Sequence, residues 1–456
     1  MPETESHRIC VIGAGPSGLA TVKALRERGL ACDCFEREDD VGGNWCFGKP
    51  SSSVYRSTHL ISSKRLTEFA DFPMPKAYPP YPSREQVHDY LRTYAREFGL
   101  YDNIEFNRSV DRVEPAERGW LVQLAGEPAV RHYARVFIAN GHHWSPRMPN
   151  YAGSFAGEVI HSHAYKSPDV LVGRRVLVVG AGNSGCDIAV EAAQHAAAAF
   201  ISLRRGYHFL PKFMHGKPID VLGLNLQRAR FPLWLRRMIS AVLVRMALGP
   251  PHRFGLPRPD HKLFETHPII NSQLFYQLGH GRIRVKPDIA ALAGGEVHFT
   301  DGTREAIDLV IYATGYDVRF PFIDQSHLNW RDGFPDLHLF AFHPQRDDLF
   351  VMGMIQPNGG LWPLAELQAK LAAAFIEADL HGDLTADKFR RQKQIARPHL
   401  DGGIHFLPTP RHRLEVDYYT FRKHLRKLLA QFRPPSTRPS SLTPRPSPQA
   451  APQSAY

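Results

Sequence analysis

The chain has few cysteines, and no pattern would join them. Its 456 residues include five cysteines, none of them in a C-x-x-C pair. Cys32 and Cys34 would share one face of a strand, with poor geometry for a bridge. We therefore expect a reduced, cytoplasmic protein that lacks structural disulfides and the redox pair of a disulfide reductase.

A long uncharged hydrophobic run is also missing. The most apolar stretch, residues 231–248, contains Arg236, Arg237 and Arg245, which make insertion across a bilayer costly. We expect either a helix packed over a nucleotide domain beside a substrate channel, or a cationic helix in peripheral contact with a membrane surface. Because polar residues lead straight into an apolar strand at Ile9, no secretory signal is expected.

Residue sets for a metal centre or a nucleophile triad are not apparent. His142 and His143 are adjacent, but neighbours on a turn point differently and no further ligands stand at ligating spacing, so no metal is expected. Much of the formal net charge of +11 comes from the C-terminal third, without a recognised nucleic-acid module. We interpret this charge as a solvated basic face that helps to attract an anionic cofactor, and expect no nucleic-acid partner.

Two glycine-rich turns are the most informative feature that is present. Each follows a short apolar strand, at residues 8–12 and 174–179, and each has G-x-G-x-x-G spacing before a helix. Such glycines let the backbone approach a pyrophosphate, while the free N–H groups of the helix attract its charge. The residues expected to bind are Gly13, Ala14, Gly15, Pro16, Ser17 and Gly18 at the first turn, and Gly180, Gly182, Asn183, Ser184, Gly185, Cys186 and Asp187 at the second.

The residues after each turn distinguish the two dinucleotides. The strand expected at residues 31–35 ends at Glu36, whose carboxylate would accept hydrogen bonds from ribose hydroxyls. The matching strand after the second turn, residues 199–203, ends in Arg204 and Arg205 and has no acid. Two guanidiniums suit a 2′-phosphate, which favours NADPH over NADH. The alternative is that both arginines are ordinary surface charges.

The order of strands and helices predicts an α/β fold with two Rossmann-like dinucleotide-binding domains, the second inserted into the first. Ala139 and Ala313 each close an apolar strand and lead into similar turns, where the chain would cross between domains. A helix is expected at residues 365–378. The expected parts are the first domain at 1–165 and 286–432, the second domain at 166–285 with a helical insert at about 219–265, and a disordered Pro/Ser-rich tail at 433–456.

Further motifs resemble the flavin-containing monooxygenases, within the class B flavoprotein monooxygenases. Residues 155–165 match the fingerprint F-x-G-x-x-x-H-x-x-x-Y of that family, in which Baeyer–Villiger relatives carry a tryptophan at the last position. The fingerprint residues are Phe155, Gly157, His161 and Tyr165. The resemblance covers about residues 8–380, and it also includes residues 34–37, 42–45, 141–143, 182–189 and 312–316.

The resemblance implies a dimethylaniline monooxygenase-like enzyme with FAD at the first turn and NADPH at the second. Reduced flavin would capture O₂ as a C4a-hydroperoxide and transfer one oxygen to a soft nucleophile, an amine nitrogen or a sulfide sulfur. His161 and Tyr165 are expected to order the linker between the domains rather than to touch substrate. Beyond the turn residues, the implied cofactor contacts are Glu36, Gly43, Asn44, Trp45 and Gln368 for FAD, and Arg204 and Arg205 for NADP.

One position departs from the family pattern. Family members usually read T-N-S-S-K where this chain has residues 60–64, so Ile61 replaces an asparagine expected beside the flavin and nicotinamide. An isoleucine side chain neither donates nor accepts a hydrogen bond. Either Ser62, Ser63 or His59 provides the missing group, or the hydroperoxide decays to hydrogen peroxide.

Three other functions remain open on the sequence. An uncoupled NADPH oxidase or flavin reductase on the same scaffold is made plausible by Ile61. Baeyer–Villiger oxygenation of ketones is a second alternative, and a non-catalytic dinucleotide sensor is a third, against which both intact glycine turns argue. NADPH consumption with and without candidate substrates, measured beside peroxide release, distinguishes them.

Overall fold

Two parallel five-stranded sheets form the frame of the molecule. The computed structural model describes residues 7–229, 231–395 and 397–433. In both sheets the strand before a glycine turn is central, and a strand of the same sheet runs parallel on each side of it. In spatial order, the first sheet contains β23 (Leu349–Val351), β7 (Arg135–Ile138), β1 (Ile9–Ile12), β2 (Cys32–Phe35) and β3 (Ile104–Glu105), and the second contains β16 (Ile283–Lys286), β11 (Ala198–Ser202), β10 (Arg175–Val179), β20 (Leu309–Tyr312) and β9 (Glu158–His161).

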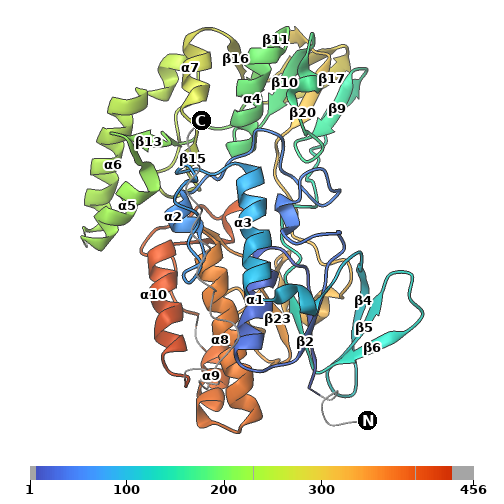
Figure 1. The fold of residues 1–456 in the computed structure, drawn as a ribbon. Coiled ribbons are helices and arrows are strands. Elements are labelled where there is room, and N and C mark those ends of the chain that lie inside the picture. The colour runs from blue at the N-terminus through green and yellow to red at the C-terminus, as the bar shows by residue number, and fades with distance from the viewer. Residues whose placement is uncertain (1–6, 230, 396, 434–456) are drawn as a thin grey trace, which may run out of the picture.

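The first sheet is covered on both faces. Ile9 and Val11 of β1 pack into a core shared with the helices, whereas Cys10 and Ile12 point into a second core beneath a three-stranded sheet. This alternation is the pattern of a strand buried between two layers. The helical layer contains α1 (Pro16–Glu27), α2 (Lys64–Thr67), α3 (Arg84–Glu97), α8 (Trp362–Leu380), α9 (Leu384–Ile395) and α10 (Tyr418–Leu429), and the small sheet contains β4 (Val110–Pro115), β5 (Trp120–Leu124) and β6 (Val130–Tyr133) (Figure 1).

The second sheet repeats this arrangement. Val176 and Val178 of β10 pack with α4 (Asn183–His195), while Leu177 and Val179 face the other core. A four-stranded sheet lies over that second core. Its strands, in spatial order, are β19 (Arg304–Ala306), β18 (Glu296–Phe299), β17 (Ile289–Gly294) and β8 (Ala152–Phe155).

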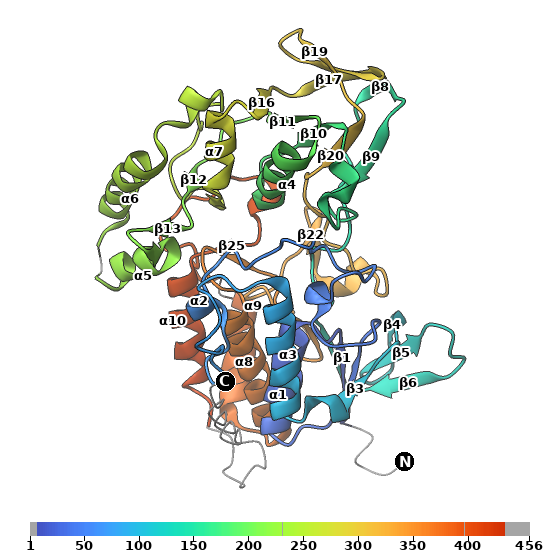
Figure 2. The same cartoon turned by 45° about the horizontal axis from the view of Figure 1, so that its top comes forward.

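A helical arm of α5 (Ile219–Arg228) and α6 (Leu233–Leu248) stands at one side of the second domain, outside α7 (Gln273–Gly279), which packs on α4 (Figures 1 and 2). No residue of α6 is buried, and Trp234 and Met246 are 66% and 79% exposed. The short strands that complete the fold are β12 (Phe209–Leu210), β13 (Phe213–Met214), β14 (Lys217–Pro218), β15 (Ile269–Ile270), β21 (Trp330–Arg331), β22 (Phe334–Pro335), β24 (Gln356–Pro357) and β25 (Glu415–Val416).

The two segments that cross between the domains run against each other. The backbone N–H of Arg147 donates to the carbonyl of Gly315 at 3.0 Å, and that of Asp317 donates to Ser145 at 2.9 Å. The side chains of Arg147 and Asp317 add an ion pair of 2.7 Å. The crossings after Ala139 and Ala313 therefore form one short hydrogen-bonded ribbon.

The fold confirms two Rossmann-like domains with the second inserted into the first. The sequence places the return of the chain near residue 286, but β20 pairs with β10, so the chain stays with the second sheet through residue 312. Likewise, β9 pairs with β20 rather than with the first sheet. The two sheets are both parallel and apolar, so a strand's sequence does not reveal which sheet it joins. The predicted disordered tail lies outside the described residues except for Arg433.

Candidate functional site

The first turn is shaped by contacts that only glycine allows. Gly13 has φ +99°, and a Cβ there would come within 2.8 Å of the carbonyl oxygen of Ala139. A Cβ on Gly18 would lie 1.8 Å from the carbonyl oxygen of Gly13. Helix α1 begins within the turn, at Pro16. The backbone is therefore held at the helix N-terminus in the form that suits a pyrophosphate.

The second turn has the same construction. Gly180 has φ +102° and its Cβ would come 2.7 Å from the carbonyl oxygen of Ala313, while a Cβ on Gly185 would lie 2.0 Å from the carbonyl of Gly180. The carbonyl of Ala313 thus lies against Gly180 in the same way as the carbonyl of Ala139 lies against Gly13. Two cradles that a side chain would fill fit the backbone requirement of two dinucleotides.

Glu36 is bound to the first turn itself. Its Oε2 accepts a hydrogen bond of 2.6 Å from the N–H of Ala14, and its Oε1 accepts one of 3.0 Å from Glu38. Burial raises the pKa of Glu36, and the two N–H donors oppose that rise. Each carboxylate oxygen keeps a second lone pair, so the group remains able to accept a hydrogen bond from a ribose hydroxyl.

The turn at Gly43–Trp45 packs against the first glycine turn. A Cβ on Gly43 would lie 3.0 Å from the Cα of Gly15. Asn44 Oδ1 accepts hydrogen bonds from the backbone and the hydroxyl of Ser53, at 2.7 and 2.8 Å. The ring of Trp45 meets that of Trp362, the first residue of α8, edge-on at 6.3 Å. These contacts bring the predicted residues Gly43, Asn44 and Trp45 beside the first turn.

Gln368 of α8 is hydrogen-bonded to two loops close to the first glycine turn. Its side chain is fully buried, its Nε2 donates to the carbonyl of Leu339 at 2.8 Å, and its Oε1 accepts from the N–H of Gly353 at 3.3 Å. Gly353 in turn lies so close to the first turn that a Cβ on it would meet the hydroxyl of Ser17 at 2.0 Å. Gln368 therefore holds the loop before α8 against the turn through backbone groups.

The first turn of α4 is tied to its surroundings by side chains. Asn183 Oδ1 accepts from the N–H of Ile270 at 2.9 Å. Asp187 accepts from the hydroxyl of Tyr55 at 2.9 Å and from the amide of Asn271 at 2.7 Å. Because Tyr55 belongs to the segment of the first domain between β2 and α2, this hydrogen bond links the two dinucleotide domains. Ser184 is exposed, whereas Cys186 is buried.

The two arginines after β11 differ in their surroundings. Arg205 Nη2 pairs with both oxygens of Asp260, at 2.7 and 3.0 Å, and this contact lowers the pKa of Asp260 to about 2. Arg204 is exposed. Sequence spacing gave no sign of Asp260, since it lies far along the chain in the segment that follows the helical arm.

The fingerprint residues lie along the edge of the second domain and at the crossing. A Cβ on Gly157 would meet the ring of Phe155 at 2.6 Å. His161 ends β9, its ring meets that of Tyr316 at 5.2 Å, and its Nδ1 accepts from the N–H of His163 at 3.1 Å. Tyr165 is fully buried, and its hydroxyl donates to Glu191. These positions suit ordering of the crossing segment.

The loop that carries Ile61 lies between the domains. Ile61 is 37% exposed, and the hydroxyl of Ser62 is 2.7 Å from that of Thr67. The N–H of Ser63 donates to Asp220 of α5 at 2.6 Å, so the helical arm contacts this loop. Burial raises the pKa of Asp220. The sequence did not indicate that Asp220 contacts this loop.

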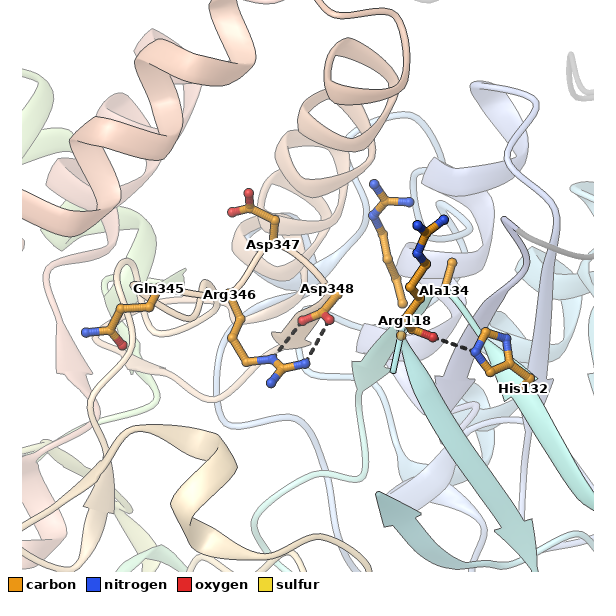
Figure 3. A pocket seen from close by; sticks show the side chains of 9 residues that line it. Arg118, His132, Ala134, Gln345, Arg346, Asp347 and Asp348 are labelled. Atoms are coloured by element: carbon orange, nitrogen blue, oxygen red, sulfur yellow. Dashed lines mark hydrogen bonds and ion pairs between the residues drawn. The ribbon is translucent and has the colours of Figure 1, made fainter. Parts of the chain in front are cut away.

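A cavity of about 430 Å³ opens elsewhere, at the outer end of the first sheet. Among its charged side chains, Arg346 binds Asp348 at 2.9 Å through two nitrogens, and His132 contacts the carbonyl of Arg118 at 2.5 Å (Figure 3). Asp347 pairs with Arg390 and Lys393. None of the residues that line the cavity is a predicted dinucleotide-binding residue, so the cavity lies apart from the two dinucleotide sites.

Comparison with known proteins identifies the family to which a chain with these two glycine turns belongs. A family model described as flavin-binding monooxygenase-like matches residues 6–386. The chain belongs to this family. It is an FAD- and NADPH-dependent monooxygenase.

The relatives of this monooxygenase cover most of its length. Flavin-containing monooxygenase 5 of Oryctolagus cuniculus is 32% identical over 441 residues, which are 90% of this chain and 80% of the relative. Dimethylaniline monooxygenase (N-oxide-forming) 2 of Macaca mulatta is 34% identical over 402 residues, 82% of this chain and 74% of the relative.

Solved structures share the monooxygenase fold. S-allyl-L-cysteine S-oxygenase from Allium sativum has a TM-score of 0.64 and 21% identity, covering 93% of this chain and 88% of that one. Cyclohexanone monooxygenase bound to ε-caprolactone has a TM-score of 0.67 and 18% identity, covering 93% and 98%. Among the helices of the described residues, none combines the length and apolarity needed to cross a membrane.

Proposed function

We propose that this monooxygenase transfers one oxygen atom from O₂ to a soft nucleophile, an amine nitrogen or a sulfide sulfur. The observation that carries the proposal is the pair of equivalent glycine cradles, Gly13 against Ala139 and Gly180 against Ala313. Two dinucleotides held by one chain provide a route for electrons from NADPH to FAD, and reduced FAD supplies the chemistry that activates O₂. Tyr165 at the last fingerprint position supports N- or S-oxygenation over a ketone substrate.

The residues of the chain bind, orient and shield. Gly13 to Gly18 would hold the FAD pyrophosphate and Glu36 its ribose, while Gly43, Asn44 and Trp45 line the flavin side. Gly180 to Asp187 would hold the NADP pyrophosphate, with Arg204 and Arg205 near the 2′-phosphate. Tyr55 and Asp187 fix the second domain relative to the first. Such fixed geometry keeps the reacting atoms close and water out.

A second candidate, an NADPH oxidase that releases peroxide, is favoured by one observation. Ile61 offers no hydrogen bond, and the nearby Ser62 hydroxyl is 2.7 Å from that of Thr67. We propose that oxygen transfer competes with peroxide release in this chain. Ile61, Ser62 and Ser63 are the residues that determine how much of the NADPH oxidised leads to oxygen transfer and how much to peroxide.

We also propose that the protein works in the cytoplasm. All five cysteines are buried and unpaired, which suits a reducing compartment. The exposed apolar face of α6, next to Arg236 and Arg237, makes peripheral contact with a membrane surface compatible with that location.

The test is a substrate panel of tertiary amines, sulfides and ketones, with NADPH, peroxide and product measured together. We expect NADPH oxidation to rise with an amine or a sulfide and peroxide per NADPH to fall, with an N-oxide or S-oxide as product. Ketones giving esters or lactones would replace the proposal with Baeyer–Villiger chemistry. Peroxide equal to NADPH for every substrate would establish the oxidase.

A further inference from the structure

A second cavity, of about 730 Å³, lies in the first domain between the stretch before β23 and the C-terminal segment. One wall comes from residues 329–345. The other comes from the end of α9, Leu400 and Arg413, all of which follow residue 386, where the match to the family model ends. This volume is typical of sites for small organic molecules. None of the lining residues is a predicted dinucleotide-binding residue, so this cavity also lies apart from the two dinucleotide sites.

Apolar side chains make up much of the lining. Leu339 and Leu400 are buried, and Leu337 and Phe340 are half-buried. A ligand that places its apolar groups against these side chains removes them from water, which is the main favourable contribution to the binding of most organic molecules. The cavity therefore suits a ligand with an apolar body.

Leu339 and Phe340 form the tip of a tight hairpin, in a conformation that such residues rarely adopt. Their φ angles are +55° and +56°, in the left-handed region that favours glycine and asparagine. His338 and Phe342 exchange two backbone hydrogen bonds of 2.9 Å at the base of the tip, and Nε2 of Gln368 donates to the carbonyl of Leu339 at 2.8 Å. Strained backbone of this kind persists only where its surroundings hold it, and it is concentrated at functional sites. The hairpin thus fixes two apolar side chains in the wall of the cavity.

The charged side chains that line the cavity are mostly cationic. They are Arg331, Lys393, Arg397 and Arg413, against the two carboxylates Asp332 and Asp336. Lys393 is buried and is neutralised by Asp347 at 2.8 Å. Arg331 and Arg397 share one carboxylate, because both pair with Oδ2 of Asp336. Two guanidiniums around one carboxylate leave an excess of positive charge.

Arg413 adds to this excess from the rim of the cavity. Its side chain donates to the backbone carbonyl of Asp332. Among the described residues, no carboxylate oxygen lies within 4.0 Å of its guanidinium. A guanidinium presents several N–H donors in a planar fork that matches a carboxylate. Arg413 is therefore placed to bind an anionic group at the opening of an apolar cavity.

We propose that this cavity binds a small organic anion, a carboxylate carried on an apolar body. The carboxylate lies at Arg413, and the body lies against Leu337, Leu339 and Phe340. An uncharged molecule of the same length would lack the contact with Arg413, and a cation would meet the excess of positive charge. The inference goes beyond the proposed function, because oxygen transfer and the binding of both dinucleotides involve other residues.

The experiment is calorimetric titration of the oxidised FAD-bound protein with octanoate and with 1-octanol, its uncharged counterpart. We expect octanoate to bind about tenfold more tightly than 1-octanol, and Arg413→Gln to abolish that difference, because a charge-assisted contact is lost. Leu337→Asn should weaken both ligands by a similar factor. The control is Arg304→Glu, at a side chain of β19 that is 72% exposed and does not line the cavity, and it should bind both as the unaltered protein does.

Three results would overturn the proposal, given variants with the melting temperature and flavin content of the unaltered protein. The first is an unaltered protein that binds octanoate no more tightly than 1-octanol. The second is octanoate binding that Met246→Gln weakens and Arg413→Gln does not, which would place the ligand on the exposed face of α6. The third is octanoate binding that NADP⁺ abolishes and Arg413→Gln leaves unchanged, which would place it at a dinucleotide site.

Discussion

The carbonyl oxygen of Ala313 lies where a side chain on Gly180 would have to go, 2.7 Å from its would-be Cβ. Ala139 and Gly13 stand in the same relation at 2.8 Å. In each domain, the residue that ends one strand and starts a crossing thus closes the glycine turn of the neighbouring strand. The segments that cross between the domains therefore begin in direct contact with the two glycine turns.

Substitution of either glycine should therefore remove one cofactor and leave the other. Gly13→Val should yield a protein without bound FAD, because the valine would collide with the backbone at Ala139 and shift the turn. Gly180→Val should keep FAD, with a flavin spectrum that dithionite bleaches but NADPH does not. Flavin content and anaerobic reduction measure both effects. Gly126→Ala is the matched control, since Gly126 has φ +75° but no atom within 4 Å of its would-be Cβ. Normal NADPH reduction in Gly180→Val would refute the assignment of the second turn.

Nucleotide preference should depend on the end of β11. Arg204→Ala together with Arg205→Ala should erase the preference of flavin reduction for NADPH over NADH, because charge-assisted contacts to phosphate are worth roughly 1.5–3 kcal/mol each. Anaerobic stopped-flow reduction at varied nucleotide concentration gives the apparent Kd. Asp260→Asn is an informative companion, since it releases Arg205 from its ion pair and should strengthen NADPH binding. Equal use of NADPH and NADH by the unaltered protein would mean that these arginines face solvent.

Local sequence sufficed for the cradles but not for their partners. A glycine turn is specified by the strand before it and the helix after it, so Gly13–Gly18 and Gly180–Gly185 were readable from spacing. Asp260, the ion-pair partner of Arg205, comes from a distant segment of the chain, and no short motif marks it. Even α8 shows this division: its apolar run predicted residues 365–378, while the structure begins it at Trp362 and ends it at Leu380.

Acid should destabilise the protein partly through the histidine at the crossing. His161 is 5% exposed, and its burial lowers its pKa to about 4. An unfolded histidine titrates near pH 6.5, so between about pH 6.5 and 4 the unfolded chain binds more protons. The contribution is fully present above pH 6.5 and is lost as the pH falls toward 4, amounting to at most about 2 kcal/mol between pH 7 and 5.

Urea unfolding at several pH values tests this contribution. His161→Asn, whose Oδ1 replaces the accepting Nδ1, should show a smaller loss of unfolding free energy on going from pH 7 to pH 5. His298→Asn, at a side chain that is 41% exposed, is the control and should follow the unaltered protein. A His161→Asn variant with the same pH dependence as the unaltered protein would show that this histidine does not carry the effect.

Ile61 should make the enzyme leak reducing equivalents as peroxide. Restoring an amide by Ile61→Asn should lower the peroxide released per NADPH oxidised, because a missing hydrogen bond of about 1–3 kcal/mol changes a rate roughly five- to a hundredfold. Ile61→Val, which changes size without adding a polar group, is the control. Peroxide yields that are the same in Ile61→Asn and the unaltered protein would show that another group, such as Ser62 or Ser63, already serves.

The most direct measurement is the fate of labelled oxygen. The enzyme would turn over with NADPH and a tertiary amine or a sulfide under ¹⁸O₂, and the product would be analysed by mass spectrometry. We predict one ¹⁸O atom in each N-oxide or S-oxide formed, with the second oxygen atom leaving as water and with product and peroxide together accounting for the NADPH oxidised. Product without label would contradict oxygen transfer by this protein. So would an amount of labelled peroxide equal to the amount of NADPH oxidised.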